Sequence, residues 1–162
     1  MKKIAFLTLA ALIAIPALAF AQAPEGEKEK SKHKIVKADA VMYEPIDVPG
    51  FDSGMQIAVL QGEPMGESGN YTLRLKFPDG YRFPAHYHPK AEQLTVLSGT
   101  FLLARGETED YEAVETYAPG AYMYIPPEDR HYGGATGQTV IQLHGTGPWG
   151  IEYLNPEDDP RN

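Results

Sequence analysis

Three side chains that can bind a metal ion lie within one short stretch of this chain, from Gly80 to Gly99: they are His86, His88 and Glu92. Successive side chains of an extended strand point to opposite faces, so two histidines one residue apart share a face, with their Cα atoms about 6.6 Å apart. Both imidazoles could then reach one ion, and Glu92 follows after a short turn. Two neutral imidazoles and a carboxylate form a mixed nitrogen and oxygen site for a divalent cation.

The spacing of these residues resembles the first motif of the cupin superfamily, and it reads Gly80-x5-His86-x-His88-x3-Glu92-x6-Gly99. A looser second match follows about twenty residues on, as Gly120-x5-Pro126-x-Glu128-x2-His131-x3-Ala135. A histidine pair alone is weak evidence, whereas two motifs in the right order are much stronger. The resemblance, to small single-domain bacterial cupins, implies that His131 joins the first three residues as the fourth metal ligand.

The second motif departs from the cupin pattern at two positions. Cupins usually have Gly where Glu128 stands and Asn where Ala135 stands. The first departure concerns the geometry of a turn, and the second concerns a contact behind the ligands. The ligand His131 is retained, so the departures leave the expected ligand set intact.

The rest of the chain indicates an all-β fold. Short runs of apolar and β-branched residues are separated by Gly and Pro turns, and no long window outside the N-terminal segment has a helical period. Many short strands are typical of a sandwich or barrel, and the resemblance implies the double-stranded β-helix, or jelly-roll barrel, of the cupins. We expect breaks at Ser98-Gly99 and Gly133-Gly134, among others. The expected strands are 40–43, 55–61, 71–77, 82–88, 93–97, 100–105, 113–117, 121–125, 139–144 and 150–154.

The N-terminal segment has the features of a secretory signal peptide. Two lysines precede a mostly apolar run, residues 4–20, and a small-residue end at 21–23, so we expect cleavage after Ala23. The charged residues 24–34 are expected to be a flexible tether, and 35–162 the cupin domain. The segment predicts a periplasmic or secreted protein with no stable membrane anchor after cleavage.

Composition limits the partners of the chain. Its 162 residues carry a net charge of -8, and removal of the signal with its two lysines makes the balance more acidic still. An acidic chain is a poor partner for nucleic acid or anionic membranes. There is no cysteine, so neither disulfides nor a thiol nucleophile are available. We expect a small molecule as substrate or ligand, and the resemblance implies a homodimer.

The ion decides whether such a site is catalytic. Three imidazoles and one carboxylate oxygen would leave about two positions of an octahedral ion open for water, dioxygen or substrate. A tetrahedral zinc ion would be saturated by the same four groups, which would make the site structural. The expected cofactor is one divalent ion of Fe, Mn, Ni, Cu or Zn, and the choice among them stays open.

Four further polar residues are candidates for contacts behind the ligands or with a substrate. His144 and Gln142 share strand parity near the end of an apolar run, and both could face the lumen. The alternative for His144 is a hydrogen-bonded histidine at a strand end. Tyr122 and Tyr124 share one strand face, and a phenol near the metal could act as acid or base. The alternative for the tyrosines is simple packing.

Three classes of function remain open at this stage. The first is a metalloenzyme, most plausibly a dioxygenase-like oxidoreductase, with a metal-dependent lyase or isomerase as a variant. The second is a binding or sensing module that holds a small ligand or a metal without turnover. The third is a structural metal clip in an exported oligomer.

Overall fold

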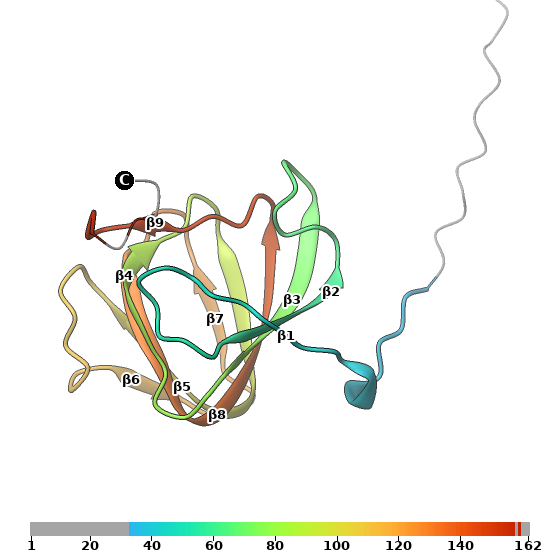
Figure 1. Ribbon diagram of the computed structural model, residues 1–162, viewed down its shortest axis with the longest axis horizontal. Helices are drawn as coiled ribbons and strands as arrows, with labels where there is room; N and C mark the ends of the chain where they lie inside the picture. Colours follow the sequence, from blue (N-terminus) through green and yellow to red (C-terminus); the bar gives the residue numbers. More distant parts are fainter. Residues whose placement is uncertain (1–32, 158, 160–162) are drawn as a thin grey trace, which may run out of the picture. The chain divides into compact units, whose positions relative to one another are not determined.

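The computed structural model describes residues 33–157 and 159 (Figure 1). The predicted signal peptide, residues 1–23, and residues 24–32 of the predicted tether therefore lie outside the described residues. The chain divides after Lys34, and the unit that begins at Ile35 contains every described strand. Within the described residues, no helix has the length and apolar character needed to cross a bilayer.

Nine antiparallel strands form the domain, and a short 3-10 helix, η1 (Ala38–Ala40), precedes them. The strands pair in the order β1-β2-β3-β8-β4-β9, and β5 pairs with β6, β7 and β8. The strands are β1 (Glu44–Pro45), β2 (Gln56–Gln61), β3 (Asn70–Phe77), β4 (Arg82–Tyr87), β5 (Glu92–Arg105), β6 (Glu115–Tyr117), β7 (Tyr122–Ile125), β8 (His131–Thr146) and β9 (Glu152–Tyr153).

Two long strands, β5 and β8, hold the barrel together. They pair with each other along most of their lengths, and β8 also pairs with β3 and β4. Along β8, Ile141 and Leu143 are almost fully buried, whereas Gln142 and His144, which alternate with them, are partly exposed. This alternation defines the inside of the barrel, where apolar side chains of β3, β5, β7 and β8 form the core.

The predicted all-β barrel of the cupin type is confirmed, and most expected strands are present. One is wrong: residues 40–43 form no strand, because η1 occupies their start and β1 begins at Glu44. The expected strands 93–97 and 100–105 are two parts of the single strand β5, and 139–144 is part of the longer β8.

Two of the expected glycine breaks are also wrong, because the glycines lie inside strands. Ser98-Gly99 lies in β5, where the register with β8 shifts and Gly99 has a φ of 75°. Gly133-Gly134 lies in β8, and a Cβ on Gly133 would stand 2.1 Å from the carbonyl oxygen of Leu102. These glycines allow a bulge and a close approach of two backbones rather than a turn.

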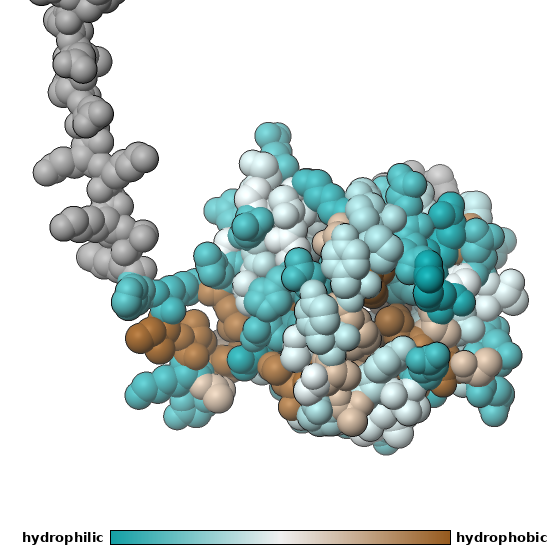
Figure 2. Space-filling model, turned by 180° about the vertical axis from the view of Figure 1, so that it is seen from behind, coloured by the Kyte–Doolittle hydropathy of each residue, from teal (hydrophilic) through white to brown (hydrophobic). Residues whose placement is uncertain are grey.

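Several large apolar side chains of the described residues are exposed on the outer surface, among them Met42 and Met65. Figure 2 shows one face, on which teal and pale residues predominate and brown apolar areas gather on the left and toward the middle and bottom of the view. The exposed large apolar side chains of the described strands include Leu97 on β5 and Tyr122 and Tyr124 on β7.

Candidate metal centre

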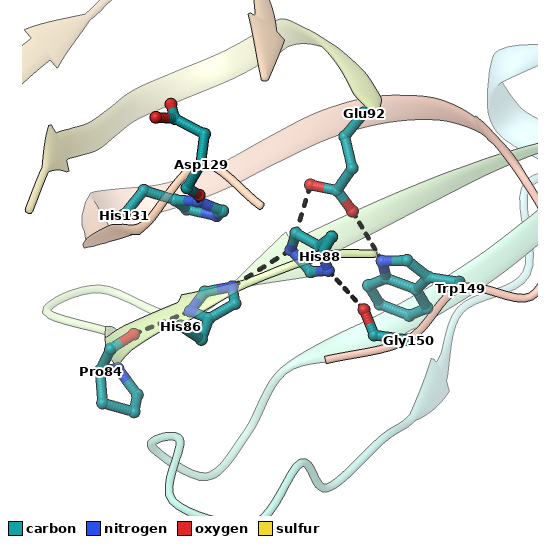
Figure 3. A network of polar contacts seen from close by, with 8 residues as sticks. All are labelled: Pro84, His86, His88, Glu92, Asp129, His131, Trp149 and Gly150. Atoms are coloured by element: carbon teal, nitrogen blue, oxygen red, sulfur yellow. Dashed lines mark hydrogen bonds and ion pairs between the residues drawn. The ribbon is translucent and has the colours of Figure 1, made fainter. Parts of the chain in front are cut away.

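Three imidazoles meet inside the barrel. His86 is on β4, His88 follows directly after that strand, and His131 is the first residue of β8. His86 and His131 are opposite each other in the β4–β8 ladder. All three side chains are buried, and their candidate ligand atoms lie within 4.8 Å of one another. The predicted convergence of the two motifs on one point is therefore present, and Figure 3 shows the rings side by side.

Backbone carbonyls orient each imidazole. The Nδ1 of His86 lies 2.8 Å from the carbonyl oxygen of Pro84, and the Nδ1 of His131 lies 2.8 Å from that of Asp129. The Nδ1 of His88 lies 2.7 Å from the carbonyl oxygen of Gly150. A carbonyl oxygen can only accept a hydrogen bond, so each Nδ1 carries the proton. The Nε2 atom of each neutral ring is therefore left with a free lone pair.

These lone pairs face one another, which fits a bound cation. The Nε2 atoms of His86 and His88 are 3.2 Å apart, and the Nε2 of His88 is 3.3 Å from Oε2 of Glu92. Acceptors this close repel unless a proton or a metal ion lies among them. Ligand atoms on one ion with bonds of about 2.0–2.2 Å are themselves about 3 Å apart. The donor set therefore fits a divalent ion without rearrangement of these two pairs.

The surroundings of the rings favour the neutral form that a metal needs. Burial lowers the pKa of His86 well below its usual range, and the nearby imidazoles of His131 and His88 lower it further. Burial also lowers the pKa of His131, although its hydrogen bond to the carbonyl of Asp129 opposes the change. A buried cation is costly without a partner, so both rings stay unprotonated at neutral pH.

Glu92, the first residue of β5, contacts the imidazole of His88. Its side chain is buried, and its second oxygen, Oε1, accepts a 2.7 Å hydrogen bond from the indole Nε1 of Trp149. Trp149 was not among the expected site residues. It follows β8 in the chain and lies 57 residues from Glu92, so no local spacing pointed to it.

The segment that carries His86 is irregular, and a side chain stabilises the irregularity. The register of β4 with β8 shifts between Phe83 and His86. The amide of Ala85, within the shift, donates to Oε1 of Glu109 at 2.9 Å. Tyr111 of the same loop donates to the carbonyl of Phe83 at 3.0 Å. The loop between β5 and β6 therefore satisfies backbone groups that the ladder leaves free next to the imidazole.

The two departures from the cupin pattern have structural explanations. Glu128 has a φ of 62°, the left-handed conformation that a glycine would adopt freely, and its amide donates to the carbonyl of His88 at 2.9 Å. The turn therefore keeps its geometry in spite of the glutamate. Ala135 is fully buried, and its amide donates to the carbonyl of Tyr81 at 2.9 Å, so its side chain contributes packing only.

A cavity of about 40 Å³ lies among the candidate ligands. His86, His88, Glu92 and His131 are its only titratable lining residues among those that the structure describes. The other lining side chains are apolar or aromatic: Val48, Phe51, Met55, Leu75, Phe77, Phe83, Leu94, Phe101, Leu103, Ile125, Ile141, Leu143, Trp149 and Ile151. A volume of this size holds on the order of two or three water molecules.

The four additional candidates are not among the residues that line this cavity, so the possibility that they face the lumen does not hold. His144 bonds through its ring to Thr72 at 3.0 Å and to Gln142 at 3.2 Å, on the outer face of the sheet. Tyr122 and Tyr124 are 61% and 57% exposed. The reason is parity: the apolar residues that alternate with them, Leu143 and Met123, are buried and occupy the inward positions.

Comparisons with known proteins agree with this fold. A family model described as the ChrR Cupin-like domain matches residues 31–150. No curated protein matches the chain in sequence. The polyketide cyclase RemF from Streptomyces resistomycificus has a similar structure, with a TM-score of 0.63 and 20% identity over 80% of this chain and 90% of that one.

Two further structures similar to this one have names that specify an oxygenase. A putative acetylacetone dioxygenase from Methylibium petroleiphilum PM1 has a TM-score of 0.60 and 21% identity over 82% of this chain and 88% of that one. An acetylacetone dioxygenase from Acinetobacter johnsonii has a TM-score of 0.60 and 16% identity, over 83% and 85% of the two chains. At these identities the likeness concerns the fold.

Proposed function

We propose that this chain, which belongs to the ChrR Cupin-like domain family, binds one divalent metal ion and uses it in an oxidoreductase reaction on a small organic molecule. The ligands would be His86, His88, His131 and Glu92. The observation that carries the proposal is the arrangement of three buried imidazoles, each with Nδ1 bonded to a carbonyl and Nε2 free to bind. Such preorganised lone pairs are costly to maintain without a cation.

The chain's own residues would give the ion a dry, partly open environment. When bound, the ion would supply redox and Lewis-acid chemistry at the positions that the four ligands leave free. The apolar wall excludes water and favours small, weakly polar molecules over charged ones. The cavity is small, so a substrate larger than a few atoms requires movement of apolar side chains such as Val48 or Phe51.

The lining favours oxidation over acid-base chemistry. A lyase or isomerase of the kind considered above needs a proton-transferring side chain besides the ligands, and a tyrosine was the candidate. No tyrosine lines the described cavity, and every titratable residue that lines it is a candidate ligand. Chemistry in this cavity would then depend on the ion itself, as in a dioxygenase.

The names of two similar structures suggest the first compound to test. Both are acetylacetone dioxygenases by name, and a third is a polyketide cyclase. We therefore propose a small β-diketone, or a related enolisable carbonyl compound, as the substrate class. We also propose that the protein works outside the cytoplasm, as its N-terminal segment predicts, and acts as a homodimer.

The test combines elemental analysis with oxygen uptake. The chain is purified, stripped with chelator and reloaded separately with Fe, Mn, Ni, Cu and Zn. We expect one equivalent of metal per chain, and oxygen uptake with acetylacetone for at least one redox-active ion. His131→Ala should abolish both metal binding and uptake. The matched control is His144→Ala, which removes a histidine of the same strand that faces outward.

The same experiment separates the alternatives. A chain that binds one equivalent of metal and retains small molecules unchanged, with no turnover for any ion, would be a binding or sensing module. The small cavity favours the form of this second candidate that holds a metal without turnover, because it leaves little room for an organic molecule beside the ion. Stoichiometric zinc with no exchangeable position would indicate a structural clip. Absence of metal binding in the unmodified chain would reject the proposal altogether.

A further inference from the structure

We propose that residues 147–153, here called the C-terminal strap, position the metal centre, and that Trp149 restricts Glu92 to a single ligating oxygen. The inference rests on the metal binding proposed above and goes beyond it, because it assigns a role to a segment that neither cupin motif includes. Trp149 is here a positioning residue: it acts on the metal through Glu92.

The strap is fixed by backbone contacts at both of its ends. At its start, the amide of Gly147 donates to the carbonyl of Gly69 at 2.8 Å, and the amide of Trp149 donates to the carbonyl of Pro64 at 2.6 Å. A Cβ on Gly147 would lie 2.6 Å from the carbonyl oxygen of Gly66, so only glycine fits there. At its end, β9 pairs with β4 and places Tyr153 opposite His86.

Between these ends the strap contacts two of the four candidate ligands. The indole of Trp149 donates to Oε1 of Glu92 at 2.7 Å, and the carbonyl of Gly150 accepts from Nδ1 of His88 at 2.7 Å. Figure 3 shows both contacts on one side of His88. In Figure 1 the chain after β8 crosses one end of the barrel to reach β9 beside β4. The strap therefore links a carboxylate and an imidazole that belong to the first motif.

The two carboxylate oxygens of Glu92 have different partners. Oε1 accepts the indole proton, whereas Oε2 points to the imidazoles, 3.3 Å from Nε2 of His88. An indole nitrogen only donates, so this bond cannot reverse. A hydrogen bond to an ionised carboxylate in a buried place is strong and directional. Held in this way, Glu92 would bind an ion through Oε2 alone, which would leave more of the ion accessible to a small molecule.

Trp149 also provides a direct readout of this contact. It is the only tryptophan of the chain, and it lines the cavity. The indole donates to a carboxylate that would bind the ion, so loading with an open-shell ion such as Ni²⁺ should change its fluorescence. We expect the change to saturate at one equivalent of Ni²⁺ in the unmodified chain, with the same dissociation constant as calorimetry gives.

A double-mutant cycle tests whether Trp149 acts through Glu92. Trp149→Phe keeps an aromatic ring and removes the N–H donor, and Glu92→Ala removes the acceptor. Ni²⁺ affinity is measured by calorimetry for the unmodified chain, both single variants and the double variant. We expect Trp149→Phe to weaken Ni²⁺ binding about 10- to 100-fold, the usual effect of losing a group that orients a ligand. In the Glu92→Ala background it should have an effect of no more than about twofold.

The matched control is Tyr117→Phe, which removes another aromatic donor to a carboxylate, that of Glu115, away from the cavity. It should leave Ni²⁺ binding unchanged. An equal loss from Trp149→Phe with and without Glu92, or no loss at all, would overturn the strap inference while the proposed function stands. If Trp149→Phe fails to fold, the fluorescence of the unmodified chain decides: indole emission that does not change at saturating Ni²⁺ would overturn the strap inference. Absence of Ni²⁺ binding in the unmodified chain would reject both.

Discussion

The buried histidines and His144 differ in the hydrogen-bond partners of their ring nitrogens. His86 and His131 each direct Nδ1 to a carbonyl two residues earlier in the chain, and their Nε2 atoms turn inward. His144, on the same strand as His131, has both ring nitrogens bonded to side chains on the outer face. The first pair can therefore offer lone pairs to an ion, whereas His144 has none to spare. Orientation, more than residue type, separates a candidate ligand from a surface histidine.

The lowered pKa values predict how the metal-free chain responds to acid. The folded pKa of His86 and of His131 lies below the unfolded value, about 6.5, so the unfolded state binds more protons in between. Their contribution to stability is complete above about pH 6.5 and is lost as the pH falls through the folded pKa. Each histidine should cost up to about 1.4 kcal/mol per pH unit in that window. Urea unfolding in the presence of a chelator, repeated between about pH 8 and 5, measures this dependence.

Single replacements identify the source of the pH effect. His86→Gln cannot be protonated, so its stability should change less with pH than that of the unmodified chain. His144→Gln, which alters an outer-face histidine, should keep the full pH dependence. An unchanged slope in His86→Gln would show that other groups cause the acid instability.

At the scale of elements, the turn between β7 and β8 joins the two motifs. It follows the end of β7 at Ile125 and leads into β8, which begins at His131. Within it, the amide of Glu128 donates to the carbonyl of His88. This hydrogen bond connects His88, which follows β4, to the turn that leads into β8 and His131. The turn holds Glu128 in the left-handed backbone conformation, which costs a residue with a Cβ about 1 kcal/mol.

Glu128→Gly should therefore stabilise the chain. Glycine adopts a φ of 62° without strain, although its greater freedom in the unfolded state offsets part of the gain. We expect an increase of about 0.5–1 kcal/mol in the free energy of unfolding, measured by urea titration. The control Glu112→Gly replaces an exposed loop glutamate that has no positive φ, and it should be neutral or destabilising. A destabilised Glu128→Gly chain would show that the carboxylate has contacts worth more than the strain.

Strand parity explains how much of the site could be predicted. The His86 and His88 pair was predictable, because one intervening residue in a strand fixes a shared face. The outward direction of His144 was also present in the sequence, since Ile141 and Leu143 alternate with it and are the more apolar set. Of the two alternatives stated for His144, the hydrogen-bonded histidine is the one that its contacts with Thr72 and Gln142 fit. The glycines of β8 could not be read from the sequence, because their role depends on backbones far away in the chain.

Contacts between distant segments account for the rest. The bond of Trp149 to Glu92 joins residues 57 apart, and that of Gly150 to His88 joins residues 62 apart. Trp149 and Gly150 lie outside both motifs, and no periodic pattern in the sequence connects them with Glu92 or His88. Motif spacing finds residues that approach an ion from neighbouring strands, whereas the segment that orients them is found only once the whole chain is folded.

At the scale of the whole molecule, one outer face offers a surface for the proposed homodimer. Tyr122 and Tyr124 project from β7, and Leu97 of the neighbouring strand β5 is 39% exposed. Tyr122 also donates to Gln93 at 3.2 Å, which holds its ring in place. Tyrosines with large exposed rings are enriched in protein interfaces, where they bury area at little cost in entropy.

The combined replacement of Tyr122 and Tyr124 by Glu should convert a dimer into a monomer, because two charges on each copy would face each other across a symmetric interface. Analytical ultracentrifugation of the domain at micromolar concentration measures the change, and metal content should stay at the unmodified level because neither residue lines the cavity. The control Met65→Glu adds a charge to another exposed apolar position, between β2 and β3, and should leave the dimer intact. If the unmodified chain sediments as a monomer, the dimer proposal fails. If the double variant remains a dimer, the interface lies on another face of the domain.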